Sequence, residues 1–196
     1  MKSSIKIGCF GSSILSAYWN GAATYYRGIF KEMARLGHTI TFFEPDAYER
    51  QSHRDVESVE GVRSVVFNPE DESLRKIVSV LGDFDVLVKC SGIGVLDDYL
   101  EVLFPLISPK EQLLVFWDVD APATLAHLRA NPDCGTRQFV KNCDLILTYG
   151  GGDRVIDSYQ QVGAAACIPV YNAADPETHF PVREYHATRQ YHLLFM

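Results

Sequence analysis

IKIGCFGSSILSAYWNGAATYYRGIF, residues 5–30, runs from a short apolar stretch through a glycine-bearing loop into an aromatic-rich segment. The apolar residues 5–10 predict a strand, and apolar side chains at i, i+3 and i+4 spacing across 22–36 predict a helix. Gly37 follows directly and suits a helix C-cap. A strand, a loop and a helix in this order open many nucleotide-binding folds. The loop is therefore a candidate phosphate cradle, a candidate acceptor pocket or a plain turn.

The same alternation continues along the chain. Further strands are predicted at 38–45, 62–67, 84–90, 112–119, 144–150 and 165–171. Further helices are predicted at 69–83, at 95–107, from Ala121 onward, at 134–142 and at 153–162. No strand is joined to the next by a short Asn-Gly hairpin turn. The pattern predicts an α/β fold with a doubly wound, mostly parallel Rossmann-like sheet and helices on both faces.

Composition restricts the class of protein. The 196 residues, 47% hydrophobic and 22% charged, are typical of an ordinary globular chain with one large domain or two small ones. A net charge of −7 argues against a nucleic-acid or anionic membrane surface. No apolar run approaches the roughly 20 residues of a membrane span. The apolar stretch at the amino terminus is too short for a secretory signal. We expect a cytoplasmic protein.

The five cysteines support the same expectation. They are Cys9, Cys90, Cys134, Cys143 and Cys167. An odd number without a C-x-x-C pair predicts reduced and mostly buried thiols and opposes a metal site. We also expect no cofactor.

The carboxyl end predicts a division into parts. The polar, proline-bearing stretch 172–190 separates the predicted domain, 1–171, from YHLLFM (191–196), which has the pattern of a strand that starts and stops. We expect 172–190 to be a linker and 191–196 to begin a second domain, whose missing surface would leave an apolar face open to self-association. In the alternative, YHLLFM pairs with the edge of this domain's own sheet.

The opening loop fits neither common phosphate motif. Gly8 lies inside the strand, Gly11 follows it and the next glycine is Gly21, so the G-x-G-x-x-G fingerprint fails, and the P-loop pattern fails as well. Polar and aromatic side chains remain, namely Ser12, Ser13, Tyr18, Trp19 and Asn20. The helix that follows presents backbone N–H groups to an anion or a sugar hydroxyl. Tyr18 and Trp19 either stack on a sugar or base, or pack against the sheet edge.

Two other glycine loops follow predicted strands. SGIG (91–94) and TYGGGDR (148–154) allow close approach of a ligand to the backbone at Gly92, Gly150 and Gly151, although plain tight turns have the same pattern. Lys89 stands in an otherwise apolar strand. Because a buried lysine needs a partner, it predicts a cleft or a buried ion pair nearby.

DVDAPAT (118–124) carries two aspartates after a strand. Asp-x-Asp binds a metal in one class of sugar transferases, but two aspartates alone are a weak signal. Asp120 precedes Ala121-Pro122 and suits a helix N-cap, while Asp118 is the better candidate for a catalytic base or a contact to a substrate hydroxyl. The loop of 44–55 is dense in hydrogen-bonding groups, and within it His53 is a second candidate base, or merely an exposed side chain.

Longer blocks resemble a known family. They are GSSILSAYWNGAATYYRG (11–28), FEPDAYERQSHRD (43–55), FWDVDAPAT (116–124) and LTYGGG (147–152). These blocks resemble the amino-terminal half of the CgeB-like, spore-maturation-type glycosyltransferases. IPVYNAADPETHFPV (168–182) is similar to the I-P-N-G-V-D-x-x-x-F stretch that joins the two Rossmann-like domains of many GT-B enzymes.

The resemblance implies an acceptor-side domain. It implies a nucleotide-sugar donor held mainly by a second domain, an acceptor molecule whose chemistry the resemblance does not give, and no dependence on an Asp-x-Asp metal. By the same resemblance, Asn20 and Gly21 face the donor and Gly11 shapes the turn. Such a domain alone would be inactive or nearly so. Two rivals are a self-contained flavodoxin-like binding module, thinly supported by Ser12 and Ser13, and a Rossmann dehydrogenase, which the missing fingerprint opposes.

Overall fold

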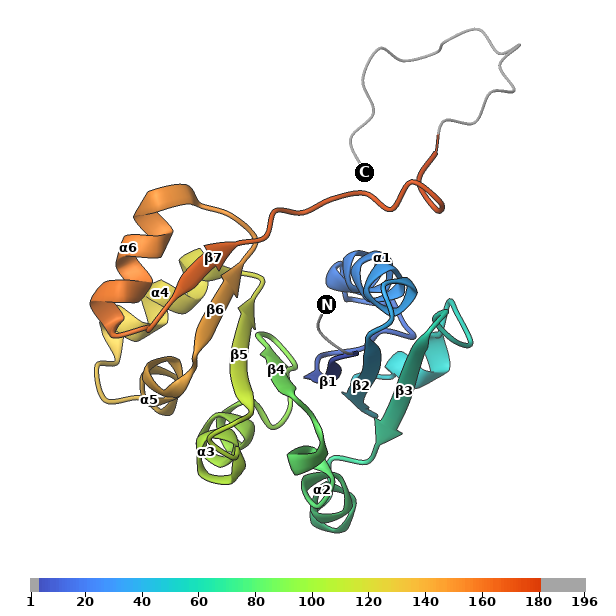
Figure 1. The fold of residues 1–196 in the computed structure, drawn as a ribbon, viewed down its shortest axis with the longest axis horizontal. Coiled ribbons are helices and arrows are strands. Elements are labelled where there is room, and N and C mark those ends of the chain that lie inside the picture. The colour runs from blue at the N-terminus through green and yellow to red at the C-terminus, as the bar shows by residue number, and fades with distance from the viewer. Residues whose placement is uncertain (1–3, 181–196) are drawn as a thin grey trace, which may run out of the picture.

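The computed structural model describes residues 4–180, which form a seven-stranded sheet with all strands parallel (Figure 1). The strands are β1 (Lys6–Phe10), β2 (Thr39–Pro45), β3 (Val62–Phe67), β4 (Val86–Cys90), β5 (Leu113–Asp118), β6 (Leu145–Thr148) and β7 (Cys167–Pro169). Each coincides with a predicted strand to within two residues at either end. The apolar runs are continuous rather than alternating because central parallel strands are buried on both faces.

Helices connect most of these strands. They are α1 (Ala22–Arg35), α2 (Asp71–Val78), α3 (Asp97–Ile107), α4 (Ala121–Ala130), α5 (Gly135–Asn142) and α6 (Gly152–Val162), with short 3-10 turns η1 (Arg50–His53) and η2 (Leu81–Asp83). Gly37 ends α1 as predicted, with φ +92° and its N–H donated to the Ala34 carbonyl. The predicted helix 69–83 is divided, since α2 ends at Val78 and η2 completes the connection.

The strand order is β3-β2-β1-β4-β5-β6-β7. The chain builds outward from β1 in one direction and then returns to β4 and builds in the other. The first six strands thus have the order of dinucleotide-binding Rossmann sheets, whereas flavodoxin-like sheets have the order 2-1-3-4-5. The point where the order reverses, between β1 and β4, is where ligands bind in such sheets.

The two faces of the sheet are covered unequally. Buried residues of α2 to α6 pack together on one face, around Phe104, Phe116 and Phe139. On the other face the buried helical residues come from α1, and Tyr26 and Phe30 pack on Trp117 of β5. Ile168 of β7 remains half exposed. Helices thus lie on both faces, with α1 serving as the main cover of the second.

After β7 the chain crosses over the α1 side of the sheet (Figure 1). We call residues 170–179 the strap. Tyr25 on α1 donates its hydroxyl hydrogen bond to the carbonyls of Val170 (3.2 Å) and Tyr171 (3.4 Å). Between the strap and α1 lies an apolar cavity of about 390 Å³. Residues 172–180 carry no helix or strand, and the rest of the predicted linker, together with the predicted strand 191–196, lies outside the described residues.

The cysteines of the structure are reduced, as predicted, and Cys134 is the one that is not fully buried. The Sγ atoms of Cys9 and Cys90 lie 3.6 Å apart on the neighbouring strands β1 and β4, and burial raises the pKa of Cys9 well above its ordinary value. In residues 4–180, no helix combines the length and the apolar character that a bilayer crossing requires.

Candidate functional site

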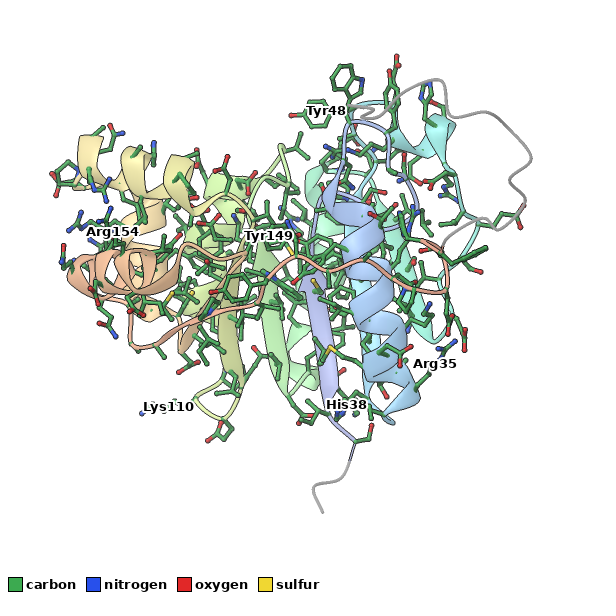
Figure 2. All side chains as sticks on the ribbon, turned by 90° about the horizontal axis from the view of Figure 1, so that it is seen from above. Arg35, His38, Tyr48, Lys110, Tyr149 and Arg154 are labelled. Atoms are coloured by element: carbon green, nitrogen blue, oxygen red, sulfur yellow. The ribbon has the colours of Figure 1, made fainter. Side chains whose placement is uncertain are left out.

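The loops that follow the strands gather at one edge of the sheet, which we call the rim. Figure 2 shows Tyr48, from the loop after β2, at the edge opposite His38 and Lys110, which precede β2 and β5. Because all strands are parallel, the rim brings together residues 11–21, 46–55, 91–96, 119–120 and 149–151. Every predicted site residue lies on the rim or in the last two positions of a strand leading to it.

The loop after β1 is closed by a carboxylate from the next strand. Glu44, fully buried at the end of β2, accepts hydrogen bonds from the backbone N–H groups of Ile14 (2.5 Å) and Leu15 (3.2 Å). The Ser13 hydroxyl (3.1 Å) and the Gln51 amide (2.6 Å) also donate to it. These N–H groups are therefore occupied by the protein's own anion, and a ligand anion would have to displace it.

Ser12 and Asn20 hold the same loop from within. The Ser12 hydroxyl donates to the Asn20 side-chain oxygen (2.9 Å), and the Asn20 amide donates to the carbonyls of Ser13 (2.7 Å) and Ser16 (3.1 Å). Both side chains are buried and engaged within the loop, whereas the sequence analysis expected them to face a substrate or donor. Gly11 shapes the turn because a Cβ there would lie 2.4 Å from the Phe42 ring. Gly21, the N-cap of α1, is exposed, and a Cβ added there would meet no atom of the described residues within 4 Å.

An exposed aromatic group stands on this closed loop. The Tyr18 ring stacks on the His53 ring with centroids 4.0 Å apart, and Trp19 is 85% exposed with a left-handed φ of +47°. His53 Nδ1 lies 2.9 Å from the Glu49 carbonyl oxygen. Of the two candidate bases, His53 is the one open to solvent.

Asp118 lies beneath the rim rather than on it. The side chain is fully buried, and its oxygens accept hydrogen bonds from the Tyr159 hydroxyl, from Thr124 Oγ1 (3.0 Å) and from the Asp120 N–H (3.0 Å). Burial and the Asp118 charge raise the pKa of Tyr159 well above its ordinary value. A base must reach the proton it takes, and Asp118 has no open side in this structure. The geometry gives it a positioning role for α4 and α6.

Lys89 forms the buried ion pair that its apolar surroundings predicted. Its Nζ lies 2.7 Å from a carboxylate oxygen of Asp97 and 2.7 Å from one of Glu101, both on α3. Burial lowers the pKa of Lys89, but the two carboxylates more than offset it, and the net shift is upward. These groups and Gly92 line an open cavity of about 250 Å³ between β4, α3 and α4.

A second rim cavity lies between the loops after β5 and β6. It measures about 220 Å³ and is lined by Asp120, Thr148, Gly150 and Gly151, among others. Asp120 is the N-cap of α4, as predicted, accepting from the Ala123 N–H at 3.4 Å. Gly150 and Gly151 have φ of +145° and +91°, which L side chains rarely adopt, so the open backbone here requires glycine.

Glu44 and Arg50 carry out roles in the rim that no sequence motif indicates. Both stand in the loop block 44–55, where polar residues are so dense that none is distinctive. Glu44 belongs to an apolar strand run, HTITFFEP, just as Lys89 belongs to another, and that position was the available signal. Arg50 is buried at the point where the strand order reverses, bonded through Nη1 to the carbonyls of Ser12 and Ile93, each at 3.3 Å.

The described rim offers little to a metal. Across residues 4–180, no three His, Cys, Asp or Glu side chains are close enough to hold an ion together. The polar groups present are instead of the kind that bind hydroxyls and oxyanions.

Comparison with known proteins bears on the fold. No protein-family model matches the chain, and no curated protein matches it. An alpha-glucosyltransferase in complex with UDP and a 13-mer DNA containing a central A:G mismatch is similar over 90% of this chain and 42% of its own, with a TM-score of 0.54 and 14% identity. Anabaena Alr3699/HepE in complex with UDP-glucose is similar over 86% of this chain and 44% of its own, with a TM-score of 0.50 and 15% identity.

Identities this low show the fold alone. The fold class is confirmed: a doubly wound, parallel, Rossmann-like α/β domain, consistent with one half of a GT-B fold. The chain spans less than half the length of both solved structures.

Proposed function

We propose that this chain is the acceptor-side, amino-terminal domain of a CgeB-like GT-B glycosyltransferase, which transfers a sugar from a nucleotide-sugar donor to an acceptor. The observation that carries the proposal is the extent of the fold match. About nine-tenths of this chain corresponds to less than half of an alpha-glucosyltransferase that was solved with UDP. The sequence blocks around Gly11, Asp118 and Gly150 support the same family.

In this proposal the donor's nucleotide is held by a second domain, which the linker from 172 onward leads to. The first domain then contributes its rim. The cavity at Asp120, Gly150 and Gly151 is the open backbone surface that a sugar or phosphate approaches, in place of the closed loop after β1. The Gly150 N–H is donated to Thr148 Oγ1 at 3.1 Å, but Gly151 is the N-cap of α6, and the partial positive charge of that helix end suits stabilisation of a leaving diphosphate.

Transfer with inversion also needs a base for the acceptor hydroxyl. We assign this role to His53 rather than Asp118, because His53 is exposed on the rim while Asp118 is buried and fully bonded. Tyr18, stacked on His53, orients the ring and offers an aromatic face to the acceptor. A net charge of −7 disfavours a nucleic-acid acceptor.

The rival flavodoxin-like module is disfavoured by strand order, since β1 is flanked by β2 and β4 here. A flavin absorption spectrum of the purified protein tests this rival directly. Tight binding of a flavin would contradict the proposed function.

The proposal itself is tested by amide chemical shifts on titration with UDP-glucose. We expect weak binding with shifts confined to the rim, at 91–96, 119–122 and 149–152, and none at His38 or Lys110 on the opposite edge. We expect no UDP release above the uncatalysed rate, because one domain closes no donor pocket. Shifts centred on the opposite edge, or turnover at the rate of a complete enzyme, would contradict it.

A further inference from the structure

Arg50 is a buried, charged side chain on the rim whose hydrogen-bond partners are neutral carbonyl groups. It begins η1 in the loop after β2, is 7% exposed, and lies between the loops that follow β1 and β4. This is the point of reversed strand order, where open α/β sheets bind ligands. Its position therefore coincides with the site that topology selects independently.

The guanidinium has no carboxylate partner among residues 4–180. Nη1 donates to the neutral carbonyls of Ser12 and Ile93 at 3.3 Å, and the buried Nε has no hydrogen-bond partner in the same part of the chain. Such unsatisfied buried groups are rare in folded proteins, and an unfilled ligand site is one of their explanations.

Among residues 4–180, neither Glu44 nor Asp97 forms an ion pair with Arg50. Glu44 is engaged by Ser13, Gln51 and two backbone N–H groups. Asp97 is engaged by Lys89 and by the Gly94 N–H. Burial is the main influence on Arg50 and lowers its pKa. The charge of Glu44 opposes this effect only in part and from beyond ion-pair distance. Since a guanidinium keeps its proton even so, a buried positive charge remains without a directly bonded carboxylate in the described chain.

Tyr48 covers this charge. Its ring lies over the guanidinium with 5.0 Å between Arg50 Cζ and the ring centroid, and its hydroxyl donates to the Gly94 carbonyl at 2.9 Å. Tyr48 thus bridges the loop after β2 to the loop after β4. A side chain at position 94 would collide with it, because a Cβ there would lie 2.6 Å from the Tyr48 ring.

The cover is weakly fastened. Tyr48 is 54% exposed, and both Tyr48 and Glu49 have a left-handed φ of +56°. One neutral hydrogen bond contributes little net stability, and a left-handed backbone at non-glycine residues favours leaving that conformation. Moving Tyr48 outward breaks that one side-chain hydrogen bond, removes the ring from the guanidinium and uncovers Arg50, whose charge a bound oxyanion would then compensate.

We propose that Arg50 binds an oxyanion of the ligand, a phosphate or a carboxylate, and that Tyr48 is a latch that opens to admit it. The guanidinium fork is suited to such groups because it donates two parallel hydrogen bonds. Combined with the proposed function, on which this reading of the ligand rests, the anion belongs either to an acidic acceptor or to the donor's diphosphate.

The experiment measures binding by titration calorimetry at low salt, with glucose 6-phosphate, glucuronate, inorganic pyrophosphate and UDP as probes, and neutral glucose as the uncharged control. Arg50→Gln is expected to weaken binding of the anionic probes at least about tenfold, as expected for a charged hydrogen bond. Tyr48→Phe keeps the ring and removes its hydrogen bond, so it is expected to tighten binding about two- to tenfold by raising the open population.

Arg54→Gln is the matched control. Arg54 is exposed on the same loop and donates to Gln51 at 2.7 Å, so its loss changes net charge equally without touching the site. Binding that falls equally in Arg50→Gln and Arg54→Gln, or that does not tighten in Tyr48→Phe, overturns the proposal. Circular dichroism checks folding, and the Tyr48→Phe arm decides if Arg50→Gln fails to fold.

The probes separate the two sources of the anion. Tighter binding of glucose 6-phosphate and glucuronate indicates that the anion belongs to an acidic acceptor. Tighter binding of pyrophosphate and UDP indicates that it belongs to the donor's diphosphate. Arg50-dependent binding of phosphate probes without any response to UDP-glucose would leave the anion site standing while the proposed function fails.

Discussion

Two lysines of this domain each bind two carboxylates, and the difference between them separates its rim from its strap. Lys89 of β4 binds Asp97 and Glu101 at 2.7 Å each. Lys31 of α1 binds Asp175 and Glu177 of the strap at 2.8 Å each. Bond lengths and partners are nearly the same, so distance alone does not distinguish them.

Their surroundings differ. The Lys89 side chain is 1% exposed and Glu101 is 5% exposed, and the ammonium also lies over the Phe116 ring at 5.4 Å. In the strap, Glu177 is 53% exposed and shares its charge with Arg35, which lies 2.6 Å away at the protein surface. Water screens the pairs that Glu177 makes, while Lys31 and Asp175, 11% and 9% exposed, are shielded only by the strap itself lying on α1. The rim cluster lies inside the domain, where no water replaces a lost partner. The comparison teaches that Lys89 is required for the folded rim, while Lys31 sets the position of a segment.

The largest effect is expected from removing the buried ammonium. Lys89→Met leaves Glu101 buried and unpaired apart from its bond with Thr136, and should lower the free energy of unfolding by about 3–5 kcal/mol. Urea denaturation measures this. The matched change on the strap, Lys31→Met, should shift the melting temperature by less than about 2 °C. If both variants, measured by the same urea denaturation, lost the same free energy of unfolding, Lys89 and Lys31 would not differ in their importance for the fold.

A double variant protects this test against unfolding. Lys89→Met combined with Glu101→Gln removes both charges and should recover part of the loss, because the buried anion is no longer uncompensated. Additive losses in the double variant would show that the pair does not act as a unit.

An intermediate effect is expected from moving the strap without changing its charges. Gly28 of α1 lies beneath it, and a Cβ there would lie 3.2 Å from the Asp175 Cβ. Gly28→Leu should therefore displace the strap and speed amide exchange at Thr178 and His179, whose N–H groups bond the Asp175 carbonyl. Mass spectrometry of exchanged peptides follows this. If amide exchange at Thr178 and His179 stayed slow, the ion pairs of the strap would not depend on its close approach to Gly28.

The smallest effect is expected from acid. Hydrogen bonds from Arg35 and then Lys31 lower the pKa of Glu177 to about 2 from an ordinary 4.5. The folded value is depressed, so the strap attachment is complete above about pH 4.5 and is lost as pH falls through about 2. An NMR titration of the Glu177 carboxyl measures this, and Arg35→Gln should raise its midpoint toward the ordinary value. An unchanged midpoint would mean that Arg35 does not hold the strap.

Much of the fold was predictable because burial on both faces of a parallel sheet leaves a direct signal in sequence. All seven strands appear as apolar runs, and the helix signals at Gly37 and Asp120 match the observed caps. The division of the predicted helix 69–83 was not predictable, because Val80 and Leu81 continue the apolar pattern of α2 although the helix ends at Val78.

The site was predictable by location but not by contact. Each predicted residue lies at or beneath the rim, because parallel strands end at one edge. Yet Ser12 and Asn20 bond each other, and Asp118 is enclosed by Tyr159 and Thr124. Those partners are 8, 41 and 6 positions apart in sequence, and no local pattern indicates which of many polar side chains meet.

The sequence by itself determined where strands and helices occur along the chain, which residues cap the helices at Gly37 and Asp120, and that Lys89 is a buried charge. Each of these depends on a residue's own polarity or on its near neighbours along the chain. The tertiary structure alone decided that Glu44 fills the first loop, that Arg50 is buried between Ser12 and Ile93 without an ion pair to any described residue, and that the strap lies on α1. The reason is that these depend on packing between segments 30 to 146 positions apart, where shape and burial choose the partners.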